Sequence, residues 1–246
     1  MFQRLLIIFT AVILSAFAVQ AQTNPTAQTL PFSFTSQSGS TLPAGMAVHV
    51  FAASPTSPIL TPGTGDMAYN AGATSGGWRD EAANGIAMLG SSSVNAGAFV
   101  VAVDTTGLTN VQVSWIARTI TQQASRDNSL TLQYRVGTTG NFTDVDQANT
   151  TYSTTGQSAG HSASFGPFTL PVAAENQSVV QLRWIYWQNN ALTGSRDRIA
   201  LDDIGISGSA GSPTNTPAGD TPTPTNTPEP TTTPTATHTP PTPTTV

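Results

Sequence analysis

Few residues of this chain could do nucleophilic or metal chemistry. It contains no cysteine and three histidines, His49, His161 and His238, which lie far apart in the sequence. A Ser–His–Asp triad needs a nucleophile held on a sharp turn, and a zinc site needs three or four nitrogen, sulfur or oxygen ligands. Scattered histidines without cysteine match neither pattern well. We therefore expect the histidines to face solvent or to make single hydrogen bonds.

The carboxylates give no better case for catalysis. Glu81 and Glu175 are the only glutamates between residues 30 and 208, and both fall in expected loops. Glycoside hydrolysis needs two carboxylates roughly 5–10 Å apart in a cleft. No strand carries closely spaced acids flanked by aromatic residues, so we expect a non-catalytic protein rather than a hydrolase.

Two adjacent acids, Asp202 and Asp203, interrupt an otherwise apolar segment. Neighbouring residues of a strand point to opposite faces, so one of these acids should be directed inward unless the strand bulges. A buried carboxylate must be hydrogen-bonded, paired with a cation or bound to a metal. We expect hydrogen bonds from loop N–H groups or a pair with Arg196 or Arg198. The alternative is a structural Ca²⁺ site, because hard oxygen ligands fit that ion.

Three segments have apolar residues at every second position, at 111–117, 130–136 and 180–186. The apolar set should face the core. If the three strands share one sheet, the opposite set forms a surface suited to carbohydrate, with planar donors for hydroxyls and an aromatic ring for the apolar face of a sugar. The alternative is a solvated face whose arginine stems cover isoleucines. The candidate ligand-binding residues are Arg118, Gln133, Arg135, Arg183 and Trp187.

Alternation with period two dominates the middle of the chain, whereas helical spacing of apolar residues is not sustained there. Turn signals such as Thr105-Thr-Gly107 and Gly137-Thr-Thr-Gly140 separate the segments. Nine or ten short strands joined by polar loops predict an all-β fold, a two-sheet antiparallel jelly-roll sandwich. The weakly patterned stretch from 54 to 84 is expected to be a long loop.

Both ends of the chain differ from this middle part. One arginine, a fifteen-residue apolar run from Leu5 to Val19 and a small residue at Ala21 predict a secretory signal peptide over residues 1–21. Residues 209–246 contain ten prolines and fifteen threonines and predict a disordered linker or stalk. The expected order is signal peptide, a short linker at 22–29, the sandwich domain at 30–208 and the tail.

The composition excludes several classes of partner. The chain has no lysine, eight arginines and a net charge of −5, which does not suit the neutralisation of nucleic-acid phosphates. Only 9% of residues are charged, against roughly 25% in an average soluble protein. Ser, Thr, Asn, Gln and Gly must therefore cover the surface. We expect a secreted, extracellular protein, with no membrane insertion after signal cleavage and no cofactor apart from the Ca²⁺ alternative.

Several motifs follow one another along the folded part of the chain: Leu42-Pro-Ala-Gly45, Ala87-Met-Leu-Gly-Ser91, residues 127–135 and 142–145, Val180-Gln-Leu-Arg-Trp184 and residues 197–204. With these motifs, residues 31–207 resemble a secreted bacterial jelly-roll module of the MAM-like or concanavalin A-like kind, found with extracellular nucleases, lamin-tail domains and cell-surface proteins. The resemblance implies a non-catalytic accessory or adhesive domain and transfers no ligand. The nuclease domain that sometimes follows such modules is not present in this sequence.

Two function classes follow for the folded part. The first is a module that binds carbohydrate or another cell-surface polymer, displayed on a Pro/Thr-rich stalk. The second is a structural or spacer domain of a surface protein with no ligand of its own. An enzymatic role enters only if the chain is the N-terminal accessory part of a longer secreted enzyme, such as a nuclease.

Overall fold

The computed structural model describes residues 22–52, 56–72, 76–91, 96–123, 126–190 and 193–211. The chain divides into two units, Met1–Gly211 and Ser212–Val246, and every described residue belongs to the first. The expected signal peptide and nearly all of the expected Pro/Thr-rich tail lie outside the described residues. The first unit is built almost entirely of strands.

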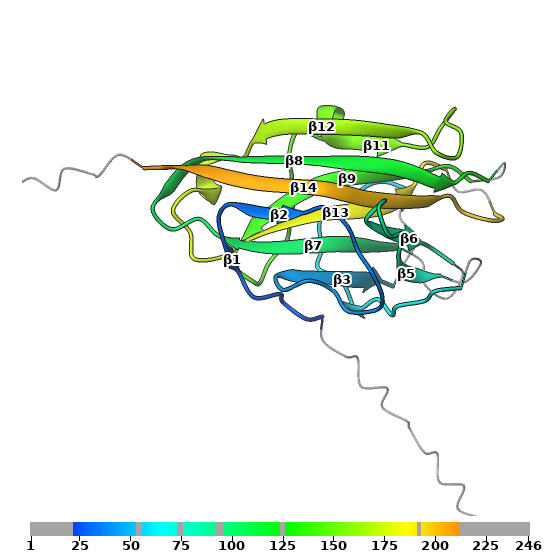
Figure 1. Ribbon diagram of the computed structural model, residues 1–246, viewed down its shortest axis with the longest axis horizontal. Helices are drawn as coiled ribbons and strands as arrows, with labels where there is room; N and C mark the ends of the chain where they lie inside the picture. The colour runs from blue at the N-terminus through cyan, green and yellow to red at the C-terminus, as the bar shows by residue number, and fades with distance from the viewer. Residues whose placement is uncertain are drawn as a thin grey trace, which may run out of the picture. The chain divides into compact units, whose positions relative to one another are not determined.

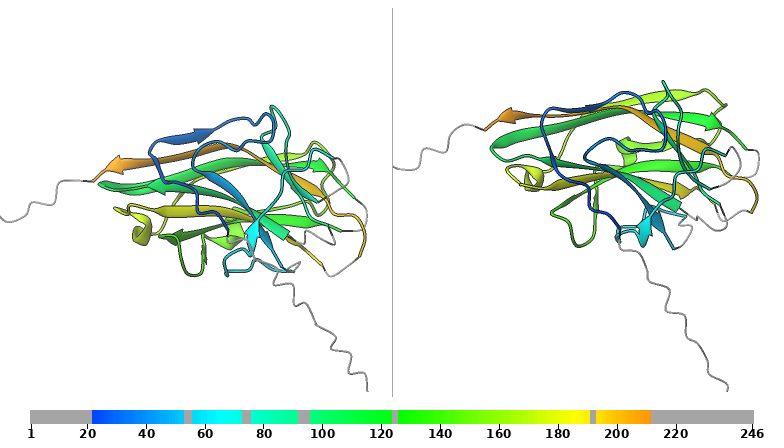
Figure 2. Two further views of the ribbon diagram at one scale, coloured as in Figure 1. Left: turned by 90° about the horizontal axis from the view of Figure 1, so that it is seen from below. Right: turned by 60° about the horizontal axis from the view of Figure 1, so that its bottom comes forward.

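Two mainly antiparallel sheets form the domain, and the views in Figures 1 and 2 show them as two layers. The eight-stranded sheet has the order β10-β9-β13-β7-β3-β4, with β1 parallel to β7 and β11 paired with β9. Its strands are β1 (Gln28–Thr29), β3 (Met46–Phe51), β4 (Gly65–Asp66), β7 (Ala96–Asp104), β9 (Asn128–Val136), β10 (Thr143–Asp144), β11 (Thr151–Ser153) and β13 (Val180–Gln188).

The second sheet has six strands in the order β12-β8-β14-β6-β5, and β2 extends it beside β14. Its strands are β2 (Phe32–Phe34), β5 (Gly77–Asp80), β6 (Ile86–Leu89), β8 (Leu108–Thr121), β12 (Ser162–Thr169) and β14 (Arg198–Ala210). Within the described part the helical elements are one turn of α-helix, α1 (Gln147–Thr150), and one 3₁₀ turn, η1 (Val172–Ala174). No helix there is long and apolar enough to cross a membrane.

The long strands alternate between the two sheets along the chain. Strands β7, β9 and β13 lie in the eight-stranded sheet, while β8, β12 and β14 lie in the six-stranded sheet. Each connection from β7 to β8, from β8 to β9 and from β13 to β14 therefore crosses from one layer to the other. The predicted antiparallel jelly-roll sandwich is confirmed.

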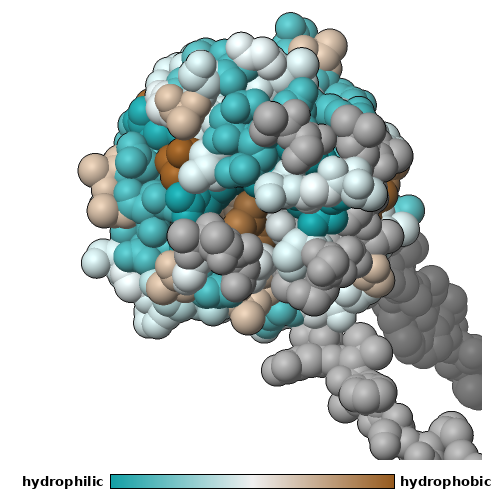
Figure 3. All heavy atoms as spheres, turned by 90° about the vertical axis from the view of Figure 1, so that its right-hand side faces the viewer, coloured by the Kyte–Doolittle hydropathy of each residue, from teal (hydrophilic) through white to brown (hydrophobic). Residues whose placement is uncertain are grey.

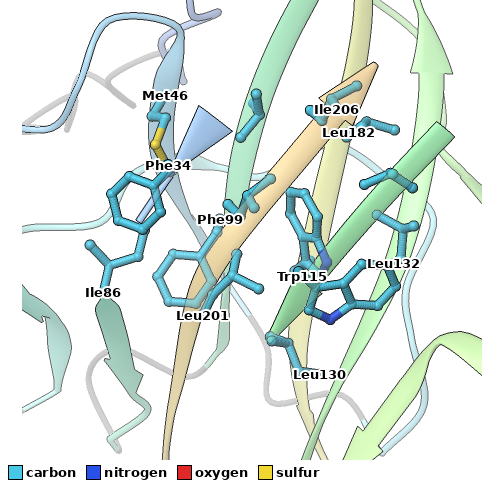
Figure 4. Packing of buried hydrophobic residues seen from close by; sticks show 14 of the residues in the cluster. Phe34, Met46, Ile86, Phe99, Trp115, Leu130, Leu132, Leu182, Leu201 and Ile206 are labelled. Carbon is cyan, nitrogen blue, oxygen red and sulfur yellow. The ribbon is translucent and has the colours of Figure 1, made fainter. Parts of the chain in front are cut away.

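One hydrophobic core fills the space between the sheets. Trp115 of β8 stacks on Phe165 with ring centroids 5.0 Å apart and meets the edge of Trp184 at 5.7 Å. Figure 4 shows Trp115, Phe99 and Leu201, which come from both sheets, pointing into this shared interior. The predicted apolar set of the three alternating segments is buried, except for half-buried Tyr134 and exposed Val136 near the end of β9.

The N-terminal boundary expected from the sequence is wrong. Residues 22–29 do not form a linker, since Gln28 and Thr29 pair in parallel with β7. Thr23 also donates two hydrogen bonds to the carboxylate of Asp66, at 2.8 Å from its backbone nitrogen and 2.5 Å from its hydroxyl. The stretch from 54 to 84, expected as one long loop, contributes β4 and β5 to the two sheets.

We predict that Trp184→Ala lowers the free energy of unfolding by about 3–5 kcal/mol, because it removes a fully buried ring at the centre of the core. Trp184→Phe should cost clearly less, because the buried indole Nε1 has no hydrogen-bond partner to lose. Urea denaturation measures both values. Val172→Ala, at a side chain that is 78% exposed, is the control and should change stability by less than about 0.5 kcal/mol. Equal losses for the two Trp184 variants would contradict this account.

Candidate functional site

The predicted carbohydrate-binding surface does not assemble as one face. Strands β9 and β13 are neighbours, with Gln133 opposite Arg183 and Arg135 opposite Gln181. Strand β8, which carries Arg118, lies in the other sheet. The condition on which that surface depended, that the three alternating strands share one sheet, is therefore not met, and Arg118 is separated from the other candidate residues.

Arg183, at the centre of the predicted surface, is completely buried. Its guanidinium donates to the carbonyl oxygens of Ile59 at 2.6 Å and Thr61 at 2.9 Å, and to the Gln133 side-chain oxygen at 2.6 Å. It also lies over the ring of Phe142, 3.8 Å from the centroid. Burial lowers the pKa of Arg183 to about 9, so the group is still charged at neutral pH.

The hydrogen-bond donors of Arg135 also find acceptors within the protein. Its guanidinium donates twice to the side-chain oxygen of Gln181, at 2.7 and 2.9 Å, and once each to Gly140 O at 2.9 Å and Asn24 Oδ1 at 3.1 Å. Burial lowers the pKa of Arg135. The outer face of the eight-stranded sheet is thus covered by the N-terminal segment, the 56–64 loop and the 137–142 turn, and it is not open to a ligand.

Trp187 is the remaining member of the predicted set. Its indole Nε1 donates to the Thr131 hydroxyl at 2.9 Å, and its half-buried ring packs beside a small apolar cluster. That cluster consists of Phe51, Ala98, Val100 and Ile185, with Ile59 from the covering loop against it. Trp187 and Ile59 therefore both pack against this cluster.

The paired aspartates lie at a β-bulge, which resolves the conflict seen in the sequence. The register shifts between Asp202 and Gly205, and Asp203 takes a left-handed backbone with φ of 47°. As a result Leu201 and Ile204 both face the core between the sheets. Neither acid belongs to that core, and Asp203 is exposed.

Asp202 is buried beneath an arginine, but not beneath one of the two expected from the sequence. Its Oδ2 lies 3.5 Å from Nη2 of Arg118, whereas Arg198 pairs with Glu81 at 3.3 Å. Burial raises the pKa of Asp202, and the Arg118 charge opposes that shift. Among the described residues, no group of three or more His, Cys, Asp or Glu side chains could hold a metal ion. Asp202 and Asp203 therefore have no third acidic or histidine ligand beside them there.

A Gly-x-Ser-x-Gly sequence is present at residues 156–160, followed by His161. In a hydrolase elbow the serine lies between a strand and a helix, but here the motif lies in the connection between strands β11 and β12. His161 stacks on Tyr152, and its Nδ1 lies 3.0 Å from the tyrosine hydroxyl. The His161 backbone nitrogen donates to the Ser158 carbonyl oxygen at 3.1 Å. Neither the Ser158 hydroxyl nor a carboxylate is hydrogen-bonded to the imidazole in the described structure, so no triad is assembled.

A cavity of about 660 Å³ lies where three loops meet at one end of the sandwich. The loops follow β6, follow β8 and precede β14, so the cavity is built from segments far apart in the sequence. Figure 3 views this end and shows a mostly hydrophilic surface with small recessed hydrophobic areas. The described lining residues are Leu89, Gly90, Ser91, Thr121, Gln123, Arg126, Thr193, Gly194, Ser195 and Arg196.

A buried aspartate holds the loops beneath this cavity together. The Asp197 carboxylate accepts hydrogen bonds from the Gln123 backbone nitrogen and from the Thr154 hydroxyl. Its own backbone nitrogen donates to Asn128 Oδ1 at 3.0 Å, and its carbonyl accepts from the Tyr186 hydroxyl at 2.6 Å. Burial raises the pKa of Tyr186 above its usual range, so this hydroxyl keeps its proton. The cavity floor is therefore fixed by hydrogen bonds to the core strands.

Two arginines reach the cavity from different loops. Arg126 and Arg196 are each 9% exposed. Burial lowers the pKa of Arg196, and the positive charge of Arg126 lowers it further. With hydroxyl and amide groups beside them, the guanidinium groups make this a concave site rich in hydrogen-bond donors. Sequence reasoning missed it, since no motif marks residues that only the loop geometry brings together.

Comparison with known proteins identifies no family. No protein-family model matches the chain, and no curated protein matches it. Among solved structures it is similar to the xylan-binding module CBM15, with 13% identity and a TM-score of 0.37 over 68% of this chain and 93% of that chain. It is also similar to the CBM22-1 xylan-binding domain of Paenibacillus barcinonensis Xyn10C, with 14% identity and a TM-score of 0.37 over 74% and 94% of the two chains.

A third solved structure is Xylanase10C of Cellvibrio japonicus in complex with xylopentaose, with 12% identity and a TM-score of 0.34. That match covers 67% of this chain but 27% of the xylanase, so the chain spans about a quarter of that protein. At these identities and scores the likenesses do not decide a ligand. The resemblance to MAM-like modules, with the associated nucleases, stays a prediction from the sequence.

We predict that Arg183→Ala lowers the free energy of unfolding by about 3–5 kcal/mol, because it leaves Gln133 and two loop carbonyls without their buried donor. Ligand binding per folded molecule should not change, since Arg183 lies beneath the covering loop. Urea denaturation and a binding assay below the unfolding transition measure the two effects. Gln112→Ala on the half-buried outer side of β8 is the control. If Arg183→Ala were as stable as the wild type but no longer bound the ligand, the binding site would lie on the outer face of the eight-stranded sheet.

A second prediction concerns the pH dependence of Asp202. Because burial raises its pKa in the folded state above the ordinary 3.8, the folded protein binds more protons than the unfolded chain just above that pH. The contribution of Asp202 to stability should therefore fall as the pH rises from about 4 toward the folded-state pKa. Asp202→Asn lacks this loss, so its stability relative to the wild type should increase over that window. Urea denaturation from pH 3.5 to 7 measures it, and the opposite slope would show that the Arg118 charge outweighs burial.

Proposed function

We propose that the sandwich domain is a non-catalytic, secreted module that binds a carbohydrate in the cavity at its loop end. The observation that carries the proposal is the concave site of about 660 Å³ lined by guanidinium, amide and hydroxyl groups. Ligand pockets in proteins span about 300–1,000 Å³. A saccharide presents hydroxyls that both donate and accept hydrogen bonds, which matches this lining.

The fixed floor supports the same proposal. Since Asp197 joins the Gln123 backbone to Thr154 and Tyr186, the part of the lining around Gln123 and Arg196 does not have to be ordered from a free loop when a ligand binds. Ordering costs of this kind reduce affinity, so a preformed site favours binding. Leu89 supplies an apolar contact for the carbon face of a sugar ring.

A spacer domain without a ligand is the second candidate, and one observation favours it. In the described part of the chain no aromatic side chain is exposed, the large exposed apolar residues being Leu60, Val136 and Val172. Sugar-binding sites often stack an aromatic ring against the ligand, and this domain would have to bind mainly through hydrogen bonds. The same domain serves equally as the accessory part of a longer secreted enzyme.

We predict that the folded protein binds one or more polysaccharides on a glycan array, and that Thr193→Trp reduces that binding at least tenfold by filling the cavity. Thr193 lines the cavity and is exposed, so the substitution should leave the fold intact. Thr106→Trp is the matched control, since Thr106 is also exposed and lies in the turn before β8, at the opposite end of that strand from Thr121.

The outcomes separate the two functions. Retained binding by Thr106→Trp with loss in Thr193→Trp supports the cavity. Equal binding by both variants would place the ligand elsewhere on the domain. The absence of binding to every glycan by the wild-type protein would favour the spacer function.

A further inference from the structure

The cavity contains an unusual pair of charges. Arg126 and Arg196 are the only ionisable side chains among its described lining residues, and no carboxylate lines it there. Each is about nine-tenths buried. Two guanidinium groups brought together in a partly desolvated site repel each other, as the effect of Arg126 on Arg196 shows. Such an arrangement costs free energy unless an anion compensates it.

The contacts of Arg126 differ from those of four other arginines of the described structure. Arg135 and Arg183 donate to carbonyl and amide oxygens, while Arg118 and Arg198 pair with carboxylates. The buried Nε of Arg126 has no hydrogen-bond partner, which is also true of Arg118 and Arg198, but Arg126 forms no ion pair with a described residue. No carboxylate of the described structure therefore pairs with Arg126, which lines the cavity.

Two acids directly follow these arginines in the sequence, and neither is among the described lining residues of the cavity. Asp127 follows Arg126 and forms no ion pair with it. Asp197 directly follows Arg196, but its Oδ1 accepts from Gln123 N and its Oδ2 accepts from Thr154 Oγ1. Both oxygens are thus committed to holding the loops, and Asp197 is fully buried rather than part of the lining. The charge on the cavity wall remains positive even though the whole chain carries −5.

We infer that the cavity recognises an acidic carbohydrate, with Arg126 and Arg196 binding its anionic group. The inference rests on the proposed carbohydrate-binding function and adds the ligand class. A guanidinium donates two parallel hydrogen bonds to the oxygens of a planar carboxylate, which suits a uronic acid residue. A sulfate ester offers the same oxygen acceptors, so the shared chemistry is an oxyanion on a sugar. The hydroxyl and amide groups around the arginines bind the rest of the ring.

Isothermal titration of the wild-type protein with three oligosaccharides tests the inference. The probes are an oligogalacturonate, its fully methyl-esterified form, which has lost the charge but kept the ring, and a sulfated neutral glucan. We expect at least tenfold tighter binding of an anionic probe than of the neutral ester, because charge-assisted hydrogen bonds are about twice as strong as neutral ones. The preference should shrink as salt is added. Preference for the galacturonate or for the sulfated glucan identifies the anion.

Variants assign the preference to the cavity. Arg126→Gln should bring the affinities for the charged and esterified probes within about threefold of each other, and Arg126→Lys should restore part of the difference. Thr138→Glu is the control, because it lowers the net charge by one as Arg126→Gln does. Thr138 is exposed in the turn after β9, whereas Arg126 precedes that strand, so this variant should keep the wild-type preference. Thermal unfolding confirms that each variant is folded.

Three results would overturn the inference. Equal affinity of the wild type for the charged and neutral probes would leave carbohydrate binding standing but reject acidic recognition. An unchanged preference in Arg126→Gln would place the anion elsewhere. The protein could also bind a neutral polysaccharide on the array but none of these three probes. That result would reject acidic recognition and leave the proposed carbohydrate-binding function standing.

Discussion

The burial of Arg183 against backbone carbonyls is the interaction on which the architecture of the eight-stranded sheet depends. Strand β13 lies in the middle of that sheet and is buried on both faces, although its sequence alternates as a half-exposed strand does. A charged side chain can occupy such a position only if its donors are satisfied. The Ile59 and Thr61 carbonyls do this for Arg183, and Asn24 and Gly140 do it for Arg135.

This covering layer determines where a ligand can bind. Once the N-terminal segment and the 56–64 loop occupy the outer face of the eight-stranded sheet, its arginines and glutamines act as structural residues that fix those segments. Asp197 joins the segment after β8 to Thr154, and the described residues after β6, after β8 and before β14 line a hollow at this end of the sandwich. A concave polar site is therefore found at the loop end rather than on the sheet face.

The sequence predicted what depends on local periodicity and missed what depends on non-local pairing. Alternation around Trp115 and Trp184 identified the inward side chains and the all-β fold correctly. The same alternation could not show that β8 and β13 belong to different sheets, because strand order is set by contacts between distant segments. It also could not tell a solvated polar face from one covered by a loop, since Arg183 is polar in both cases. The cavity joins three separate loops, and no local pattern reports their meeting.

Buried arginines show how one physical rule leads to a structural role and to the recognition role that we infer. Arg135 and Arg183 lack carboxylate partners, but neighbouring carbonyl and amide oxygens accept their hydrogen bonds, so the pair stabilises the covering layer. Arg126 is buried to a comparable degree, yet its Nε meets no acceptor and the group borders a cavity. In the recognition that we infer, a guanidinium placed this way gains free energy when an oxyanion enters. The structural and the inferred recognition roles then differ in whether the acceptor comes from the chain or from a ligand.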